Sequence, residues 1–373
     1  MSSVDPETLI ARDSATMLLA HPLRCAAAWR KAPPPWPQVL GEHTWDALAK
    51  AFRNEGRITP DVITEMHADP RHRLLANFVN YTAQDASSTE LGGAYATALY
   101  WRHLLVPQPY FVVEDALLEM LEHTDISDDL PMSVLKPPYS RCYIEFGKSR
   151  TCQQQVPNTT TGLHVLEGAY IEEGGGESQG AGLFITFTGS PVGKAHALDD
   201  ATDSLFLPTG DPTRLIQDVM AEARANSQRM AAMQDLRSSP EEFTPYAFSC
   251  LKLLVKVLLY IGLPEARKSL HPEHTVFKKQ VEAKKNPAKR AQAQKQLAYL
   301  KDYILVTAPA PRSAPGLGTG GADSGMRRHW RRGHYRLQPH GPQSSLRKVI
   351  FMQPMLVGTT TGDLQAAPNY RVR

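Results

Sequence analysis

Apolar and polar positions change their period partway along the chain. Up to about residue 130, apolar residues recur at three- and four-residue spacings, as in residues 43–56 and 89–105. This spacing places them on one face of a helix. Residues 111–125 continue it, with an apolar stripe opposite three glutamates, as in an amphipathic helix with a solvated acidic face. We therefore expect residues 1–130 to form a helical region.

The pattern then becomes short, β-branched and aromatic, bounded by Gly, Pro or Asn, which is typical of strands. The four predicted strands are residues 141–147, 162–173, 182–189 and 203–210. A glycine-rich loop at 174–180 joins the second to the third, so we expect a mostly antiparallel meander. A helix should follow from Asp211 to about residue 235, with Pro212 near its first turn, and then a buried helix over 245–261.

The last third begins with a basic helical pattern over residues 274–306, interrupted by Pro287. Residues 307–325 are rich in Gly, Pro and Ser and are predicted to be a flexible linker. Two strand-like segments, 326–338 and 346–358, flank a Pro/Gly/Ser turn and should pair as a hairpin.

These patterns predict an α+β fold in which a helical N-terminal region precedes a mostly antiparallel sheet with flanking helices, joined by the C-terminal hairpin. The predicted parts are a helical region (1–130), an α+β region with the meander and a basic helix (131–306), the linker (307–325), and a basic β-hairpin with its tail (326–373).

Composition narrows the class of protein. The chain has 373 residues, 42% hydrophobic and 21% charged, as in ordinary globular proteins. It contains no apolar run long enough for a membrane helix, and its first residues lack the basic and apolar segments of a secretory signal. The four cysteines lack the C-x-x-C spacing of zinc sites and are too few for a disulfide scaffold. We expect a cytoplasmic protein without a metal or cofactor.

Charge is unevenly distributed along the chain. Residues 265–373 contain 20 Lys and Arg against 6 Asp and Glu, a net charge of +14, whereas residues 1–264 contain 21 against 32, a net charge of −11. Such asymmetry is typical of proteins that contact nucleic acid or another polyanion. It is also compatible with a basic tail that neutralises the acidic body within one molecule.

The basic hairpin combines paired arginines with Trp330, Tyr335 and three histidines. Arginine forks bind phosphates in bidentate fashion and aromatic rings stack on bases, so this mixture favours RNA or single-stranded DNA. Strand alternation would place His329, Arg331 and Tyr335 on one face of the ribbon and Arg328, Trp330, Arg332, His334 and Arg336 on the other. The predicted phosphate-binding residues are Arg327, Arg328, Trp330, Arg331, Arg332, Tyr335, Arg336, Arg347 and Lys348, together with Lys284 and Lys285 of the basic helix.

The histidines also admit chemistry. His329 and His334 could act as general acid and base of a metal-independent nuclease, with the arginines stabilising the charged phosphate. A carboxylate such as Glu172 would complete the pair. The same groups could serve a nucleotide-using transferase, for example in ADP-ribosyl transfer. A zinc site formed by His329, His334 and His340 is disfavoured because the first two fall on opposite faces of a strand.

Binding without chemistry is the simpler hypothesis, and whether the protein is an enzyme is left open at this point. A further alternative is a partner-binding protein whose basic tail docks on an acidic protein surface, as an antitoxin-like partner would offer. The meander carboxylates Glu145, Glu167, Glu172 and Glu173 are expected at the solvated surface unless one reaches the hairpin. The sequence does not indicate the oligomeric state.

The hairpin also carries a resemblance. The run Gly333-His334-Tyr335-Arg336, then His340-Gly341-Pro342 and Arg347-Lys348-Val349-Ile350, resembles a C-terminal motif of uncharacterised proteins of phages and other bacterial mobile elements. No established activity accompanies the resemblance. It implies a role in conflict between mobile elements and their hosts, where toxins with their antitoxins, nucleases, transferases and inhibitors are found.

Overall fold

A computed structural model describes residues 20–24, 109–147, 149, 152–158, 162–176, 180–190, 201–233, 240–297, 300–309 and 329–357. The predicted helical region therefore lies mostly outside the described residues. The predicted linker does so as well, apart from residues 307–309.

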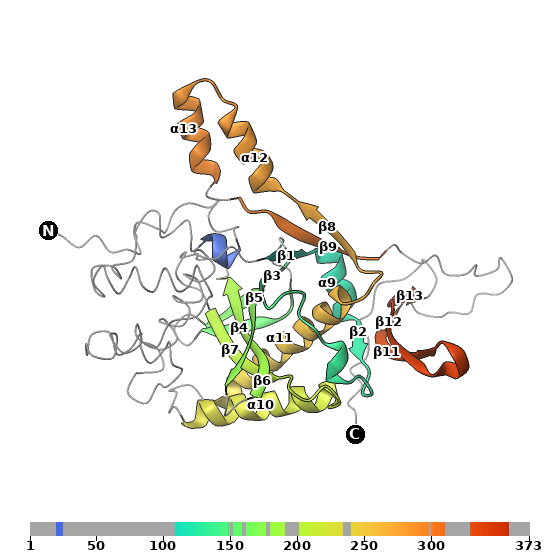
Figure 1. Ribbon diagram of the computed structural model, residues 1–373. Coiled ribbons are helices and arrows are strands. Elements are labelled where there is room, and N and C mark those ends of the chain that lie inside the picture. The colour runs from blue at the N-terminus through green and yellow to red at the C-terminus, as the bar shows by residue number, and fades with distance from the viewer. Residues whose placement is uncertain are drawn as a thin grey trace.

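An eight-stranded sheet forms the centre of the described fold, with strand order β7-β6-β5-β3-β1-β9-β8 and β4 paired to β5 (Figure 1). Strand β1 is parallel to both β3 and β9, and all other neighbours are antiparallel. The predicted α+β class with a mostly antiparallel sheet is confirmed. The strands are β1 Tyr110–Val113, β3 Arg141–Phe146, β4 Gln155–Asn158, β5 Gly162–Gly176, β6 Gly180–Ser190, β7 Ala201–Pro208, β8 Arg267–His271 and β9 Tyr303–Thr307.

The predicted meander matches β3, β5, β6 and β7, but two predicted helical segments are only partly helical. Residues 111–125 split into strand β1, helix α9 (Asp115–Glu122) and strand β2 (Thr124–Ile126). The last residues of the predicted basic helix form β9, an inner strand between β1 and β8. Both errors arise because an apolar run of four or five residues has the same local pattern in a buried strand and in a helix.

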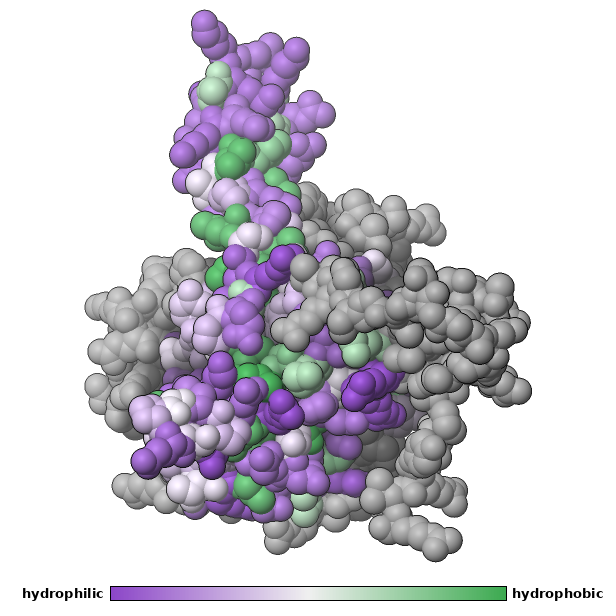
Figure 2. All heavy atoms as spheres, turned by 90° about the vertical axis from the view of Figure 1, so that its right-hand side faces the viewer, coloured by the Kyte–Doolittle hydropathy of each residue, from purple (hydrophilic) through white to green (hydrophobic). Residues whose placement is uncertain are grey.

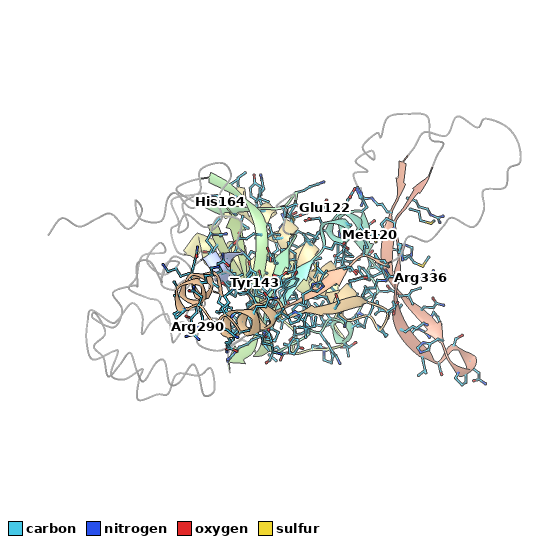
Figure 3. All side chains as sticks on the ribbon, turned by 90° about the horizontal axis from the view of Figure 1, so that it is seen from above. Met120, Glu122, Tyr143, His164, Arg290 and Arg336 are labelled. Atoms are coloured by element: carbon cyan, nitrogen blue, oxygen red, sulfur yellow. The ribbon has the colours of Figure 1, made fainter. Side chains whose placement is uncertain are left out.

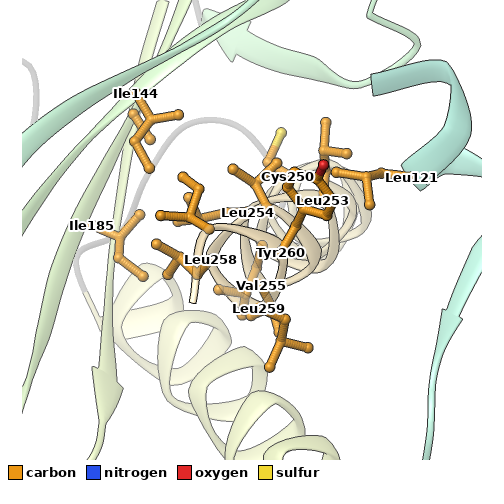
Figure 4. Packing of buried hydrophobic residues seen from close by; sticks show 14 of the residues in the cluster. Leu121, Ile144, Ile185, Cys250, Leu253, Leu254, Val255, Leu258, Leu259 and Tyr260 are labelled. Atoms are coloured by element: carbon orange, nitrogen blue, oxygen red, sulfur yellow. The ribbon is translucent and has the colours of Figure 1, made fainter. Parts of the chain in front are cut away.

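Helix α11 (Pro240–Ile261) covers one face of the sheet, with α10 (Ile216–Met233) beside it. Figure 4 shows Leu254 and Leu258 pointing toward Ile144 and Ile185 of the sheet. The α11 side chains from Cys250 to Ile261 that face this core are at most 3% exposed. Because each buried aliphatic side chain contributes about 1.5–3 kcal/mol, this helix is a main source of the fold's stability. The buried helix predicted from the sequence is thus confirmed.

The second face of the sheet is aromatic and polar. Along β1 and β3, Tyr110 and Tyr143 alternate with Phe111 and Ile144, so the tyrosines gather on the face opposite α11. Tyr143 lies at the centre of these rings. It stacks on Tyr110, with centroids 5.4 Å apart, and meets Tyr170 edge to face, with centroids 4.7 Å apart. Tyr170 also receives the described N-terminal segment, since its hydroxyl lies 2.9 Å from Nδ1 of His21.

The C-terminal chain forms the predicted hairpin. Strands β11 (Gly333–His340) and β12 (Leu346–Met352) are antiparallel and joined by a short turn with a 3-10 helix, η4 (Pro342–Ser344). The same ribbon continues in the pair β10 (His329–Arg331) and β13 (Met355–Val357).

The hairpin does not join the eight-stranded sheet, which corrects one part of the prediction. It pairs instead with β2, in parallel, in a three-stranded sheet of its own. The physical reason is that β2 directly follows α9 and presents a free edge there. A sequence pattern that predicts one helix over residues 111–125 gives no indication of the β2 edge.

Two helices project from the body near the β8 edge of the sheet (Figure 1). They are α12 (Glu273–Glu282) and α13 (Pro287–Gln296), so Pro287 begins a second helix rather than bending one. Another 3-10 turn, η2 (Met132–Val134), lies between β2 and β3. Among the described residues, none of the helices has the length and apolar character needed to cross a membrane.

Candidate nucleic-acid interface

Tyr335 anchors the ribbon to the body. Its side chain is 0% exposed, and its hydroxyl donates to the backbone carbonyl of Lys256 in α11, at 2.8 Å. Its ring stacks on Phe351 of the paired strand, and Phe351 meets Tyr260 of α11 edge to face. The prediction that Tyr335 stacks on a nucleic-acid base is therefore wrong, since the ring is buried within the protein.

Backbone contacts fix the same end of the ribbon. The N–H of Gly333 donates to the carbonyl of His123 at 2.9 Å, where the chain enters β2. A Cβ on Gly333 would lie 2.5 Å from the carbonyl oxygen of Met352, so only glycine allows this close approach. The ribbon therefore has a fixed position on the body at this end.

Charged groups lie where the ribbon meets the body. Arg332 forms an ion pair with Asp125 of β2 at 2.9 Å, and both side chains are more than half exposed. Beneath them, Nζ of Lys256 donates to the carbonyl of Leu121 at 2.9 Å. Burial lowers the pKa of Lys256 to about 8, while the charge of Asp125 acts in the opposite direction. Arg332 is thus engaged by a carboxylate, as part of the attachment.

Beyond the anchor, the ribbon leaves the body and its cations are exposed. Figure 3 shows Arg336 close to the place where the hairpin projects from the body. The cross-strand pairs Arg336–Ile350 and Gln338–Lys348 put Arg336 and Lys348 diagonally on one face. Arg331 and Arg347 are also exposed, and Arg347 donates to the carbonyls of Ser344 and Leu346 in its own turn.

Residues 329–357 contain no Asp or Glu. Apart from the pair of Arg332 with Asp125, no ion pair joins the ribbon's cations to a carboxylate of the described residues. Uncompensated arginines on an anchored projection are suited to binding phosphate oxygens.

His334 and Glu172 lie in different sheets. His334 is half-buried on β11, opposite Met352. Glu172 lies on β5 between Arg141 of β3 and Phe184 of β6, in the other sheet. Figure 1 shows β5 and β11 in different parts of the molecule. The predicted partnership of His334 with Glu172 is therefore wrong.

Several predicted site residues cannot be placed. Arg327 and Arg328 lie outside the described residues, and of His329 and Trp330 only the backbone strand is described. Lys284 and Lys285 are exposed in the turn between α12 and α13, on a projection separate from the ribbon. Within the described part of the chain, no three His, Cys, Asp or Glu side chains gather as metal ligands would.

The sequence reading missed the buried charges on the second sheet face. Arg24 and Glu167 are both 0% exposed and form two parallel hydrogen bonds, of 2.9 and 2.8 Å. Tyr110 donates to Glu145 at 2.6 Å, and Glu145 is 4% exposed. The expectation that Glu145 and Glu167 lie at the solvated surface is wrong. Alternation with apolar neighbours is typical of a strand with one solvated face, so the local pattern gave no signal that these carboxylates are buried.

Comparisons with known proteins give the class and then the family. The fold defines an α+β protein with an anchored, exposed basic ribbon. The family model described as AcrVA2-like, the anti-CRISPR type V subtype A2 family, matches residues 111–359. This match covers more than half of the chain and nearly every described element, so the chain belongs to the AcrVA2-like family. The family supports the predicted origin in a phage or mobile element. It also relates the protein to the bacterial defence against phages, which anti-CRISPR proteins oppose.

A solved structure entitled "Crystal structure of AcrVA2" is similar to 91% of this chain and 100% of its own, with 12% sequence identity and a TM-score of 0.44. No curated protein matches the chain.

Proposed function

We propose that this protein counters type V CRISPR defence in the host cytoplasm. It does so by binding the phosphate backbone of a nucleic acid through the β11–β12 ribbon, with RNA favoured over DNA. The observation that carries the proposal is the projecting part of the ribbon, where Arg336, Arg347 and Lys348 are exposed and the ribbon itself contains no carboxylate. Arg331, in β10, is exposed as well. Its family supplies the direction, because a CRISPR effector works with a guide RNA and a nucleic-acid target.

The structure changes how such binding would work. With Tyr335 buried, the described residues of the ribbon offer cations rather than a stacking platform. Binding through phosphates alone carries little sequence preference and depends steeply on salt. The anchor at Tyr335 and Phe351 holds the ribbon in place before binding, so less conformational entropy is lost on contact.

Nuclease and transferase activities are not proposed, because Asp125, the carboxylate opposite His334 in the β2–β11 pairing, forms an ion pair with Arg332. A basic ribbon could also dock on an acidic surface of the effector protein, and the test below separates that outcome from nucleic-acid binding.

The test measures binding of a labelled single-stranded RNA to the full chain over a range of salt concentrations. Arg336→Gln/Lys348→Gln should reduce the slope of log affinity against log salt by about 1.4, since each lost single-strand phosphate contact accounts for about 0.7. Lys136→Gln/Arg214→Gln removes two cations from the body and is the matched control, with an unchanged slope.

A parallel assay measures protection of a phage or plasmid from a type V CRISPR system. The ribbon variant should lose protection and the control variant should keep it. Affinity for RNA that is independent of salt, or equal in the two variants, would contradict the proposal. Binding of the effector protein in the absence of RNA, lost in the ribbon variant, would support the docking alternative instead.

A further inference from the structure

A second basic projection stands apart from the ribbon. Helices α12 and α13 form an antiparallel hairpin, here called the arm (residues 273–296), which extends well beyond the body (Figures 1 and 2). The arm contains seven Lys and Arg against two Glu, and all seven cations are exposed. They are Lys278, Lys279, Lys284, Lys285, Lys289, Arg290 and Lys295.

The base of the arm is fixed to the sheet. Asp302, just before strand β9, accepts hydrogen bonds from both the backbone N–H and the hydroxyl of Thr275 in the first turn of α12. The hydroxyl of Tyr303, the first residue of β9, donates to Glu273 at 2.9 Å. These bonds satisfy groups at the helix N-terminus that would otherwise lack partners, and they tie it to an inner strand. They also occupy one of the arm's two carboxylates.

The two helices support each other beyond that base. Val281 of α12 and Ala293 of α13 are buried, at 2% and 7% exposure. Asn286 caps α13, its side chain accepting from the N–H of Lys289 at 3.1 Å, and Pro287 occupies the first turn. The turn between the helices, with Lys284 and Lys285, is therefore held in one conformation while its ammonium groups stay in water.

The surface of the arm is not that of a groove-docking or a membrane-binding helix. Figure 2 shows its outer half as mostly hydrophilic, and the exposed Val276 lies near the base. A helix that docks in a protein groove presents an apolar stripe, and a membrane-binding helix presents large apolar side chains opposite its cations. Ala and Gln fill the positions between the cations of α13. Phosphate contact requires only the exposed charges.

We propose that the arm is a second nucleic-acid-binding element, which contacts the phosphodiester backbone independently of the β11–β12 ribbon. None of its seven cations forms an ion pair with a carboxylate of the described residues. The arm has a single Phe, Trp or Tyr residue, Phe277, so stacking on bases contributes little and its exposed cations are suited to phosphates. It projects from a different part of the body than the ribbon does, so a long polynucleotide can meet both elements and a short one only one of them.

The experiment compares three variants of the full chain, each lacking two cations: Lys284→Gln/Lys285→Gln in the arm, Arg336→Gln/Lys348→Gln in the ribbon and Lys136→Gln/Arg214→Gln in the body. Binding of a long single-stranded RNA is measured against salt. The arm variant should lower the salt slope by about 1.4, and combining the arm and ribbon variants should lower it by about twice as much. The body variant should leave it unchanged.

The variants distinguish the two proposals. An arm variant that behaves like the body variant overturns the inference about the arm, whatever the ribbon variant does. A ribbon variant without effect on the salt slope overturns the proposed function of the ribbon. The role of the arm is then decided by the arm variant alone. Because the side chains substituted in the arm and in the ribbon are exposed, unfolding measurements should show the stability of the parent chain for both variants. A destabilised arm variant is replaced by Lys289→Gln/Arg290→Gln in the same assay.

Discussion

The two faces of the eight-stranded sheet are buried by different means. On one face, α11 packs aliphatic side chains against Ile144 and Ile185. On the other, three tyrosines surround buried charges, among them the pair of Arg24 with Glu167. An apolar face tolerates substitutions that keep volume, whereas a buried polar face depends on each partner being present. The second face is therefore the more specific and the more easily disrupted of the two.

The largest expected effect comes from breaking the buried ion pair. Arg24→Ala leaves the carboxylate of Glu167 buried without the guanidinium, which should lower the free energy of unfolding by about 3–5 kcal/mol. Chemical denaturation of the full chain measures this loss.

The control replaces both partners. Arg24→Met/Glu167→Leu removes the pair together and should recover most of the stability, because no charge then remains buried without its partner. If the single variant were as stable as the parent chain, the polar face would not depend on this pair.

Substitutions on the apolar face are expected to cause a somewhat smaller loss in the free energy of unfolding. Leu254 is fully buried in α11, so Leu254→Ala should cost about 2–5 kcal/mol through lost burial and the cavity left behind. Leu254→Met keeps the volume and should cost less than about 1.5 kcal/mol. Equal losses for the Ala and Met variants, measured by denaturation, would show that shape rather than volume controls this face.

The smallest effect is the dependence of the polar face on pH. Burial, with a smaller contribution from Arg24, lowers the pKa of His21 from 6.5 to about 4, against the opposing charge of Glu167. Between these values the unfolded chain binds more protons than the folded one, so stability rises with pH across this range. The free energy of unfolding therefore decreases as pH falls from 6.5 toward 4, by up to about 3 kcal/mol for a pKa shift of this size.

The measurement is the denaturation midpoint at several pH values, with His21→Gln as the matched variant. This variant removes the titrating group, so its stability should change less over the same pH range than that of the parent chain. An identical acid dependence in both proteins would assign the effect to other groups.

The functional elements repeat the contrast between a fixed base and a free end. Tyr335 and Thr275 lie at the attached ends of the ribbon and the arm, where Lys256 and Asp302 of the body hold them. Arg336 and Lys284 lie in the projecting parts and are exposed. Sequence alternation correctly placed Tyr335 and Arg336 on opposite faces of the ribbon, but it could not say which face would be buried.

Local pattern alone determined much of the fold. Short β-branched and aromatic segments bounded by Gly, Pro or Asn predicted β3, β5, β6 and β7, since these residue types favour strands without help from distant residues. The apolar run of α11, interrupted only by Lys252 and Lys256 between Phe248 and Leu263, predicted a buried helix, and the turn at residues 341–345 predicted the hairpin. The concentration of cations after residue 265 was likewise visible in the sequence.

Tertiary structure decided the rest, because the deciding partners are distant in sequence. Strand β9 became an inner strand by pairing with β1, which lies almost two hundred residues earlier. Glu167 is buried because Arg24, 143 residues away, neutralises it, and nothing in the local pattern around either residue indicates the other. The hairpin pairs with β2, and the lysine-rich segment folds back on itself as an arm. The sequence thus set local conformation and charge, while long-range pairing decided which of those charges are buried and which are free to bind a partner.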